Sequence, residues 1–183
     1  MKNLLKNRTA LSTVVTTLII LVVSVLLAGV VTYFAINVTS TRVQEENIIL
    51  TKQHVWFDVN NETGEAAILV VNTGGRDVVF SKVSVRGQTC DWANVFYNIT
   101  NTAITSDLPY NATLAEASQT IGSTNYTLVA ASNPITLKSG YSMILYLAHP
   151  DSISVNDVGL TVAMTIFSSQ AMYYKETNVE AVS

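Results

Sequence analysis

Residues 8–42 read RTALSTVVTTLIILVVSVLLAGVVTYFAINVTSTR, and no charged side chain stands between Arg8 and Arg42. From Val14 to Val38, 16 of the 25 residues are Leu, Ile, Val or Phe. About 20 helical residues, at ~1.5 Å each, cross the ~30 Å hydrocarbon core of a bilayer. The segment is therefore long enough to span a membrane. Three roles are open to it: an export signal that is removed, an anchor that stays in lipid, or a helix that packs against copies of itself.

An ordinary secretory signal does not match this segment. The apolar core of such a signal runs for about 7 to 15 residues and ends at a small-residue cleavage site. Here the small pair Ala28 and Gly29 lies inside the apolar run. Basic residues before the run and acidic residues after it predict, by the positive-inside rule, a cytoplasmic N-terminus and an external remainder. These flanking residues are Lys2, Lys6 and Arg8 before the run, and Glu45 and Glu46 after it.

The helical pattern continues beyond the apolar run. Apolar residues recur at intervals near three or four through Val43, residues 48–50 and residues 54–57, with polar residues between them. No Gly or Pro interrupts the chain from Val30 to Asn61. We therefore expect one helix from about Leu11 to Val55. The domain boundaries that follow are a basic leader at 1–10, a hydrophobic to amphipathic assembly helix at 11–55, and an ectodomain at 56–183.

Downstream, the period of apolar residues changes from helical to alternating. AAILVVN at 66–72 is typical of a buried strand, and VVFSKVSVRG at 78–87 predicts a half-buried strand with Val79, Val83 and Val85 on one face. Alternation also predicts strands near 143–147, 158–166 and 171–176, whereas 101–123 is expected to be loops with one edge strand at most. The predicted fold class is α+β: a long N-terminal hydrophobic helix followed by an antiparallel immunoglobulin-like β-sandwich.

Composition and spacing argue against several classes of function. The net charge of −3 provides no basic field, so nucleic acid is not an expected partner. Cys90 is the single cysteine, which excludes an intramolecular disulfide and a multi-cysteine zinc site. His54 and His149 lie far apart in the sequence, outside any metal-ligand spacing, and are interpreted as structural. We expect no metal, no cofactor, no catalytic residues and no enzymatic activity.

With its basic leader MKNLLKNRTA, its uncharged segment LSTVVTTLIILVVSVLLAGVVTYFA and a β-domain containing VVNTGGRDVVFSKVSVRG, the chain resembles an archaeal type IV pilin or its relative, the archaellin. In that family a prepilin peptidase removes the class III signal peptide. The membrane assembly machinery then packs the released helices into a filament core. The resemblance implies cleavage between Ala10 and Leu11. The family usually has a basic residue directly before the Gly or Ala at the cut, whereas here Thr9 stands between Arg8 and Ala10.

The resemblance also implies which residues form the filament core and what the partners are. The precursor would sit in the cytoplasmic membrane, and the mature chain would form a homopolymer of identical subunits on the cell surface. Small residues, among them Ser24, Ala28 and Ala35, either allow close approach of helices or are merely tolerated in a membrane span. The expected filament-core residues are Val14, Leu18, Leu21, Val22, Val25, Leu26, Gly29, Val30 and Phe34.

Asn-x-Ser/Thr sequons are frequent in the chain and indicate possible glycosylation of the external part. Chance supplies several of them in a sequence so rich in Asn and Thr. Asn37 is a weaker candidate than the others because it lies within the predicted helix. The candidate glycosylation sites are Asn61, Asn98, Asn111, Asn125 and Asn37.

Two hypotheses of different classes follow. The first is a structural subunit of an extracellular filament, polymerised through its N-terminal helix, for adhesion or, in an archaellin, for motility. The second is a monomeric membrane-anchored ectodomain that binds a solute or a cell-envelope partner. An intact leader in the membrane fraction favours the second hypothesis, whereas a mature terminus at or near Leu11 favours the first.

Overall fold

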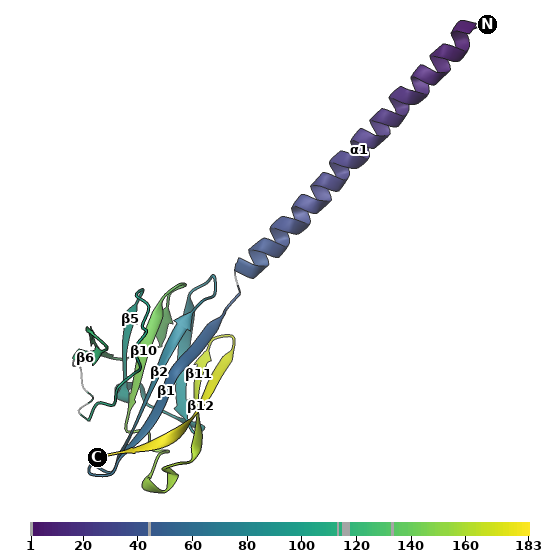
Figure 1. Cartoon of the computed structure of the whole chain (residues 1–183). Helices are drawn as coiled ribbons and strands as arrows, with labels where there is room; N and C mark the ends of the chain where they lie inside the picture. The colour runs from purple at the N-terminus through teal and green to yellow at the C-terminus, as the bar shows by residue number, and fades with distance from the viewer. Residues whose placement is uncertain (1, 44, 113, 115–117, 133) are drawn as a thin grey trace. The chain divides into compact units, whose positions relative to one another are not determined.

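The structure, a computed structural model, describes residues 2–43, 45–112, 114, 118–132 and 134–183. These residues form two compact units, one ending at Val43 and the other comprising the chain that follows. The first unit is a single helix, α1 (Lys2–Val43), and the second is built of β-strands (Figure 1). The predicted α+β class, a long N-terminal helix followed by a mostly antiparallel β-structure, is confirmed.

The prediction that the helix continues to Val55 is wrong. α1 ends at Val43, and strand β1 (Ile48–Asp58) occupies the residues that were expected to form the amphipathic end of the helix. The boundary between the helix and the ectodomain therefore lies about twelve residues earlier than expected, between 43 and 48 rather than between 55 and 56.

A β-bulge in β1 explains why this strand resembles a helix in sequence. The pairing of β1 with β2 shifts register between Thr51 and His54, and Lys52 has a φ of 53°. An extra residue in a strand reverses which side chains face the core. Ile48 and Leu50 therefore face the core before the bulge, and Val55 and Phe57 face it after the bulge. Ile48 and Val55 are thus seven residues apart, and so are Leu50 and Phe57. Residues on one face of a helix show the same spacing of seven.

Ten of the strands that the structure describes belong to one hydrogen-bonded array, and two form a separate hairpin. The array runs in the order β4-β3-β11-β12-β1-β2-β10-β5-β8, with β9 also paired to β3. The remaining bounds are β2 (Thr63–Asn72), β3 (Val78–Val85), β4 (Gln88–Thr89), β5 (Val95–Thr100), β6 (Ser118–Ile121), β7 (Thr124–Thr127), β8 (Val129–Ala130), β9 (Ile135–Leu137), β10 (Ser142–Ala148), β11 (Thr161–Ser168) and β12 (Met172–Val182), with short 3-10 helices at Trp92–Asn94 and Val155–Asp157.

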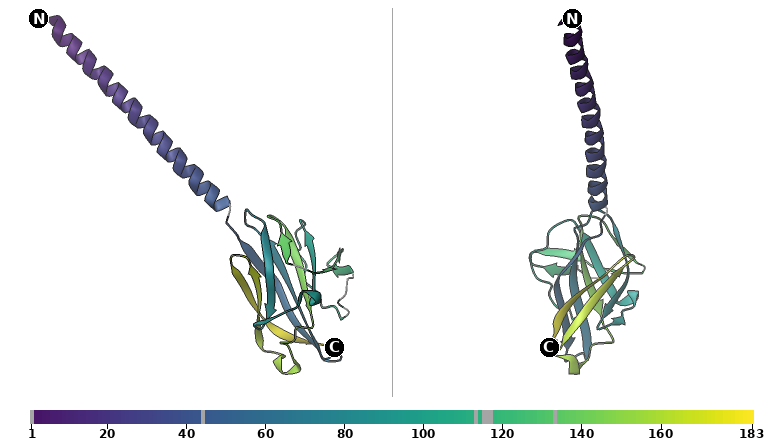
Figure 2. Two further views of the ribbon diagram at one scale, coloured as in Figure 1. Left: turned by 180° about the vertical axis from the view of Figure 1, so that it is seen from behind. Right: turned by 90° about the vertical axis from the view of Figure 1, so that its right-hand side faces the viewer.

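The array folds into two layers because β12 belongs to both. Residues 172–178 of β12 pair antiparallel with β11, and residues 179–182 pair in parallel with β1. One layer contains β1, β2, β10, β5 and β8, and the other contains β11, β3, β4 and β9. Figure 2 shows the β-domain from two further directions. A sandwich of two sheets, as expected from the sequence, is the arrangement that buries one face of each sheet.

The main hydrophobic core lies between these layers. Alternate residues of β2, β10 and β11 point into it. This confirms the buried strand predicted at 66–72 and the alternation predicted for 143–147. The alternation predicted for 158–166 is confirmed only from Thr161, where β11 begins, because Val158 and Leu160 are exposed. The core residues contributed by the three strands are Ala66, Ile68, Val70, Met143, Leu145, Leu147, Val162, Met164 and Ile166.

The predicted face of β3 is partly wrong. Val79 is 39% exposed, whereas its neighbour Phe80 is fully buried in the core with Val83 and Val85. Phe167 of β11 pairs with Lys82 and the next residue pairs with Phe80, so β3 contains one extra residue at this point. As in β1, the bulge reverses the parity of the core positions along the strand.

Residues that follow β5 cover the outer face of the layer that contains β1, β2 and β10. The described residues between Ile104 and Leu128, which include the β6–β7 hairpin, pack on this face and form a second hydrophobic cluster with it. Strands β2 and β10 are consequently buried on both faces, and this accounts for the unbroken apolar run of residues 66–71. The members of the second cluster include Trp56, Ala67, Leu69, Leu108, Ile121, Leu128, Ile144 and Tyr146.

We predict that truncating the main core destabilises the β-domain. Leu145 is fully buried, so Leu145→Ala should lower the free energy of unfolding by about 2–5 kcal/mol through lost burial and the cavity that remains. Leu160, which is half exposed, provides the control, and Leu160→Ala should cost much less. Denaturant unfolding of the full chain in detergent, followed by tryptophan fluorescence, measures both changes. Equal effects of the two substitutions would contradict the burial described above.

Candidate functional site

The most prominent candidate site is the surface of α1. The most apolar 18 residues within the segment from Leu11 to Thr41 have a mean hydropathy of 2.9, and no residue of the segment is buried. By length and composition this segment could cross a membrane. All nine predicted filament-core residues lie on it with exposed side chains, from Val22 at 46% to Phe34 at 69% for those with large side chains. Since apolar residues surround the helix on every side, water is not a suitable solvent for it.

The hydroxyl side chains of α1 do not make the helix polar. Ser24 donates to the carbonyl of Ile20 at 2.7 Å, and Thr32 donates to that of Ala28 at the same distance. A hydroxyl that donates a hydrogen bond to a carbonyl of its own helix can enter an apolar environment at little cost in free energy. Equivalent bonds of 2.9–3.0 Å are made by Thr16, Thr17, Ser40 and Thr41.

The predicted cleavage site, Ala10 and Leu11, lies within α1, which begins at Lys2. The side chain of Leu11 is 67% exposed, and the side chains of residues 1–10 lie outside the described part of the chain. Cleavage at this bond therefore stays a prediction.

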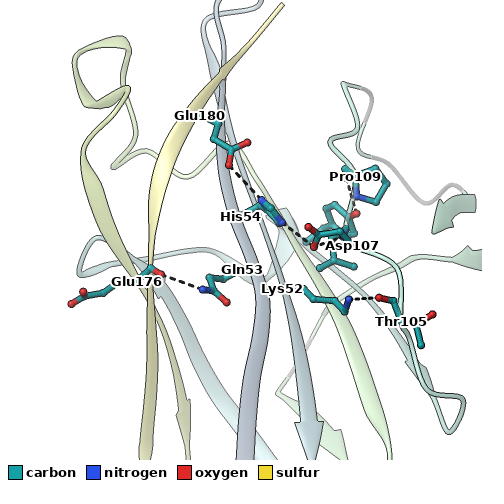
Figure 3. Close-up of polar contacts among 10 residues, drawn as sticks. Lys52, Gln53, His54, Thr105, Asp107, Pro109, Glu176 and Glu180 are labelled. Atoms are coloured by element: carbon teal, nitrogen blue, oxygen red, sulfur yellow. Dashed lines mark hydrogen bonds and ion pairs between the residues drawn. The ribbon is translucent and has the colours of Figure 1, made fainter. Parts of the chain in front are cut away.

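A second candidate is the polar cluster on the outer face of β1 (Figure 3). Lys52 Nζ donates to the carbonyl of Thr105 at 2.6 Å, and His54 Nε2 lies 3.0 Å from Asp107 Oδ1. His54 Nδ1 lies 3.7 Å from Glu180 Oε1, on β12. The contacts with Thr105 and Asp107 connect the segment 104–111 to β1. Burial alone would raise the pKa of the Asp107 carboxyl, but the hydrogen bonds from His54 and from the Leu108 backbone N–H, together with the nearby charges, hold this pKa below its ordinary value.

Aromatic side chains continue this attachment along β1. The ring of His54 stacks on that of Trp56 with 5.1 Å between centroids, and Tyr110 meets Trp56 edge to face at 5.9 Å. Tyr146 donates its hydroxyl hydrogen to the carbonyl of Pro109 at 2.8 Å. His54 thus has a structural role, as the sequence predicted, but in a strand instead of a helix.

Asp58 and Tyr110 form the far end of the cluster. The Tyr110 hydroxyl donates to Asp58 Oδ2 at 2.7 Å, and the backbone N–H groups of Asn60 and Asn61 donate to Oδ1. These bonds, the tyrosine bond first, hold the pKa of Asp58 at about 2. Burial and the neighbouring carboxylate raise the pKa of Tyr110. The pair is therefore a stable carboxylate–phenol contact at neutral pH.

Glu65 is the most perturbed acid in the described part of the β-domain. It is 5% exposed and accepts a hydrogen bond from the backbone N–H of Asn111 at 3.2 Å. Burial raises its pKa to about 8, so the carboxyl is protonated in the folded protein at pH 7. A cavity of about 20 Å³ beside it, bordered by Tyr110 and His149, has room for one water molecule.

The remaining groups offer little reactivity. Burial, followed by the charges of Asp151 and Asp91, raises the pKa of Cys90 to about 11, so its thiol stays protonated at neutral pH. Within the described ranges, no three His, Cys, Asp or Glu side chains are placed to hold a metal ion. An open surface hollow lies between Gln53 and residues 174–176 of β12, where the two strands diverge.

The structure distinguishes the candidate glycosylation sites. Asn125 is exposed in the β6–β7 hairpin, where its Oδ1 accepts a hydrogen bond from Thr120. Asn61 is exposed in a turn, but its amide nitrogen donates to Asp58 at 2.7 Å. Asn98 and Asn111 are half-buried, and their amide nitrogens donate to the Thr127 carbonyl and to Gln119. Asn37 is exposed on the apolar helix.

No protein-family model matches this sequence, and no curated protein matches it. Several solved structures share a distant likeness with the chain, including the following two. The ligand-binding region of serine-glutamate repeat protein A of Enterococcus faecium is 13% identical over 75% of this chain and 99% of its own, with a TM-score of 0.31. A structure of manganese lipoxygenase of Gaeumannomyces graminis with part of zonadhesin of Komagataella pastoris is 8% identical over 74% of this chain and 45% of its own, with a TM-score of 0.27. Likeness at this level assigns no function.

We predict that Glu65 makes the β-domain less stable as the pH rises. The unfolded carboxyl loses its proton near its ordinary pKa of 4.5, whereas the folded one keeps it until about pH 8. The contribution of Glu65 to stability is therefore highest below pH 4.5 and is lost progressively up to pH 8. Glu65→Gln should remove this component, which is on the order of 2–4 kcal/mol. Unfolding curves of both proteins at pH 5 and pH 8 would show it, and the same pH dependence in the variant would contradict it.

We also predict that Asn125 carries a glycan when the protein is made in a cell that glycosylates external sequons. Its exposed hairpin position admits a transferase, whereas the amide nitrogen of the half-buried Asn98 already donates to the carbonyl of Thr127. Asn125→Gln should remove one glycan mass from the intact protein, and Asn98→Gln should remove none. Intact-mass spectrometry tests this directly, and a bare polypeptide mass for the unaltered protein would contradict it.

Proposed function

We propose that this chain is the structural subunit of an extracellular type IV pilus-like filament that serves in surface adhesion. The single observation that carries the proposal is the helix surface from Leu11 to Thr41, which is uncharged, apolar on all sides and exposed along its whole length. The basic leader that precedes it and the external β-domain predicted after it support the same function. The archaeal pilin pattern in the sequence is the resemblance from which the proposal starts.

Assembly has a simple physical basis. Outside the membrane, the apolar side chains of the helix have to be shielded from water by protein. A fully buried Val, Leu, Ile or Phe side chain contributes about 1.5–3 kcal/mol relative to an exposed one. Once the helix leaves lipid, its side chains can be buried again by packing against the same apolar helix of other copies. The β-domain has its own two-layer core and does not need the helix in order to bury its apolar residues.

The precursor would enter the cytoplasmic membrane with its N-terminus inside. A prepilin peptidase would then cut near Ala10, and the membrane assembly machinery would draw the mature subunits into the filament. The neutral, hydroxyl-rich outer surface of the β-domains, with its glycan candidates, would face the surroundings. The same architecture would serve an archaellin, and a measurement of motility distinguishes the two uses.

The first test is the identity of surface fibres and of their N-terminus. Fibres sheared from cells that produce this chain should contain it, with Leu11 as the first residue or within one or two positions of it. A chain found only in the membrane fraction with Met1 retained would overturn the proposal and favour the monomeric anchored ectodomain.

A charge in the middle of the helix should prevent assembly without unfolding the β-domain. Leu26→Asp places a carboxylate on the exposed apolar surface, where a packed core would leave it unpaired. We expect no fibres by electron microscopy, an unchanged unfolding curve for the β-domain, and continued membrane insertion, because the remaining apolar residues outweigh one acid. Leu160→Asp, at a half-exposed apolar position of the β-domain, is the matched control and should leave fibres intact. Normal fibres from Leu26→Asp would contradict a helical core.

A further inference from the structure

Residues 104–111, here called the strap, lie on the outer face of the layer that contains β1, β2 and β10 and form no helix or strand of their own. Figure 3 shows the start of the strap, where Lys52 of β1 bonds to Thr105 and His54 of β1 pairs with Asp107. Each polar contact described above between the strap and the sheet involves an ionisable side chain of the sheet. These side chains are Lys52, His54, Asp58, Glu65 and Tyr146.

The strap can leave the sheet without breaking the ten-stranded array. Neither the strap nor the β6–β7 hairpin that follows it contributes a strand to that array. Leu108 and Tyr110 of the strap belong instead to the second hydrophobic cluster, with Trp56 and Tyr146 of the sheet. Segments that are held by side chains instead of a strand ladder open locally at a lower free energy than the core does. The strap is therefore suited to local opening.

Glu65 of β2 lies beneath one end of the strap. Its carboxyl accepts a hydrogen bond from the backbone N–H of Asn111 at 3.2 Å, and the residue is 5% exposed. A cavity of about 20 Å³ lies at this point, with Glu65 and its neighbours in β2 on one side and residues 110–112 and Leu114 on the other. Packing between the strap and the sheet is thus incomplete beside the buried carboxyl.

The groups that face Glu65 would compensate a negative charge poorly. Tyr110 of the strap and Tyr146 of β10 lie close enough for that charge to act on them, and Tyr110 is already bonded to the carboxylate of Asp58 on β1. Among the residues that border the cavity, His149 alone can carry a positive charge, and it is exposed to solvent. A single backbone N–H is a weak substitute for the water that an ionised carboxyl requires.

We propose that the strap is a pH-sensitive device, closed while Glu65 is protonated and released from β2 at its Tyr110–Asn111 end when Glu65 ionises. Opening gives water access to the carboxylate beside the cavity that already borders it. It also uncovers the apolar outer face of the sheet near Trp56 and Tyr146. The device lies within the β-domain, so it goes beyond the filament function and does not rest on it.

Hydrogen exchange of the Asn111 amide tests the strap, because this N–H is bonded to Glu65 itself. The full chain in detergent is compared between pH 6 and pH 9, with rates corrected for intrinsic exchange. The carboxyl ionises near its ordinary pKa of 4.5 when it is solvated and near 8 when it is covered. Opening should therefore become roughly 90-fold more favourable from pH 6 to pH 9, and the protection of the Asn111 amide should fall by this factor.

Two substitutions separate the switch from the other attachments of the strap. Glu65→Gln keeps a hydrogen-bond acceptor but cannot ionise, so the protection of Asn111 should no longer change with pH. Tyr110→Phe removes the bond to Asp58 and should raise opening by roughly ten-fold at every pH, with the pH dependence retained. Glu62→Gln, at an exposed position in the turn before β2, is the matched control and should leave both properties unchanged.

The Met164 amide, in the core strand β11, reports global unfolding and the folding of every variant. It should stay better protected than the Asn111 amide throughout. Equal protection of the two amides would mean that the strap opens only with the whole domain and would overturn the proposal. A pH dependence that persists in a folded Glu65→Gln variant would overturn it as well. The unaltered chain provides a test without any substitution, since unchanged protection of Asn111 from pH 6 to pH 9 would also exclude the switch.

Discussion

The helix α1 is incompatible with water, and the architecture of the chain follows from this. A helix without a charge between Arg8 and Arg42 and with apolar residues on every side has to be surrounded by lipid or by protein. In the described structure none of Leu11–Thr41 is buried. The architecture therefore separates two tasks. The helix presents an apolar surface, and the domain that follows folds around a core of its own.

The β-domain folds independently because its central strands β2 and β10 are covered by apolar side chains on both faces. Strands β2 and β10 contribute one set of side chains to the core between the layers and the other set to the cluster beneath segment 104–128. Polar contacts at the edge of this covering segment involve His54, Asp58 and Glu65. The covering segment is thus held by apolar packing in the middle and by hydrogen bonds along β1 and at the start of β2.

The sequence was sufficient for the fold class and for most strands but not for the helix end. Strict alternation in 143–147 and 162–166 identified buried faces correctly, because unbulged strands keep a period of two. In β1 and β3 an inserted residue changes this period, and nothing in the residue types at Lys52 or Ser81 marks the insertion. The cluster of Asp58, Glu65 and Tyr110 was also missed, since its members lie up to 52 residues apart and only the covering segment brings them together. The exposed helix surface, by contrast, could be recognised from composition alone.

The position of β1 has a mechanical consequence. This strand is the first element of the domain after α1, so tension carried by the helix reaches the domain through it. β1 is bonded to β2 along most of its length and to the end of β12 on its other side. A pull along such a strand loads many interstrand hydrogen bonds in parallel, in shear, rather than opening them one after another from an edge. The domain is consequently attached to its helix through one of its most resistant strands.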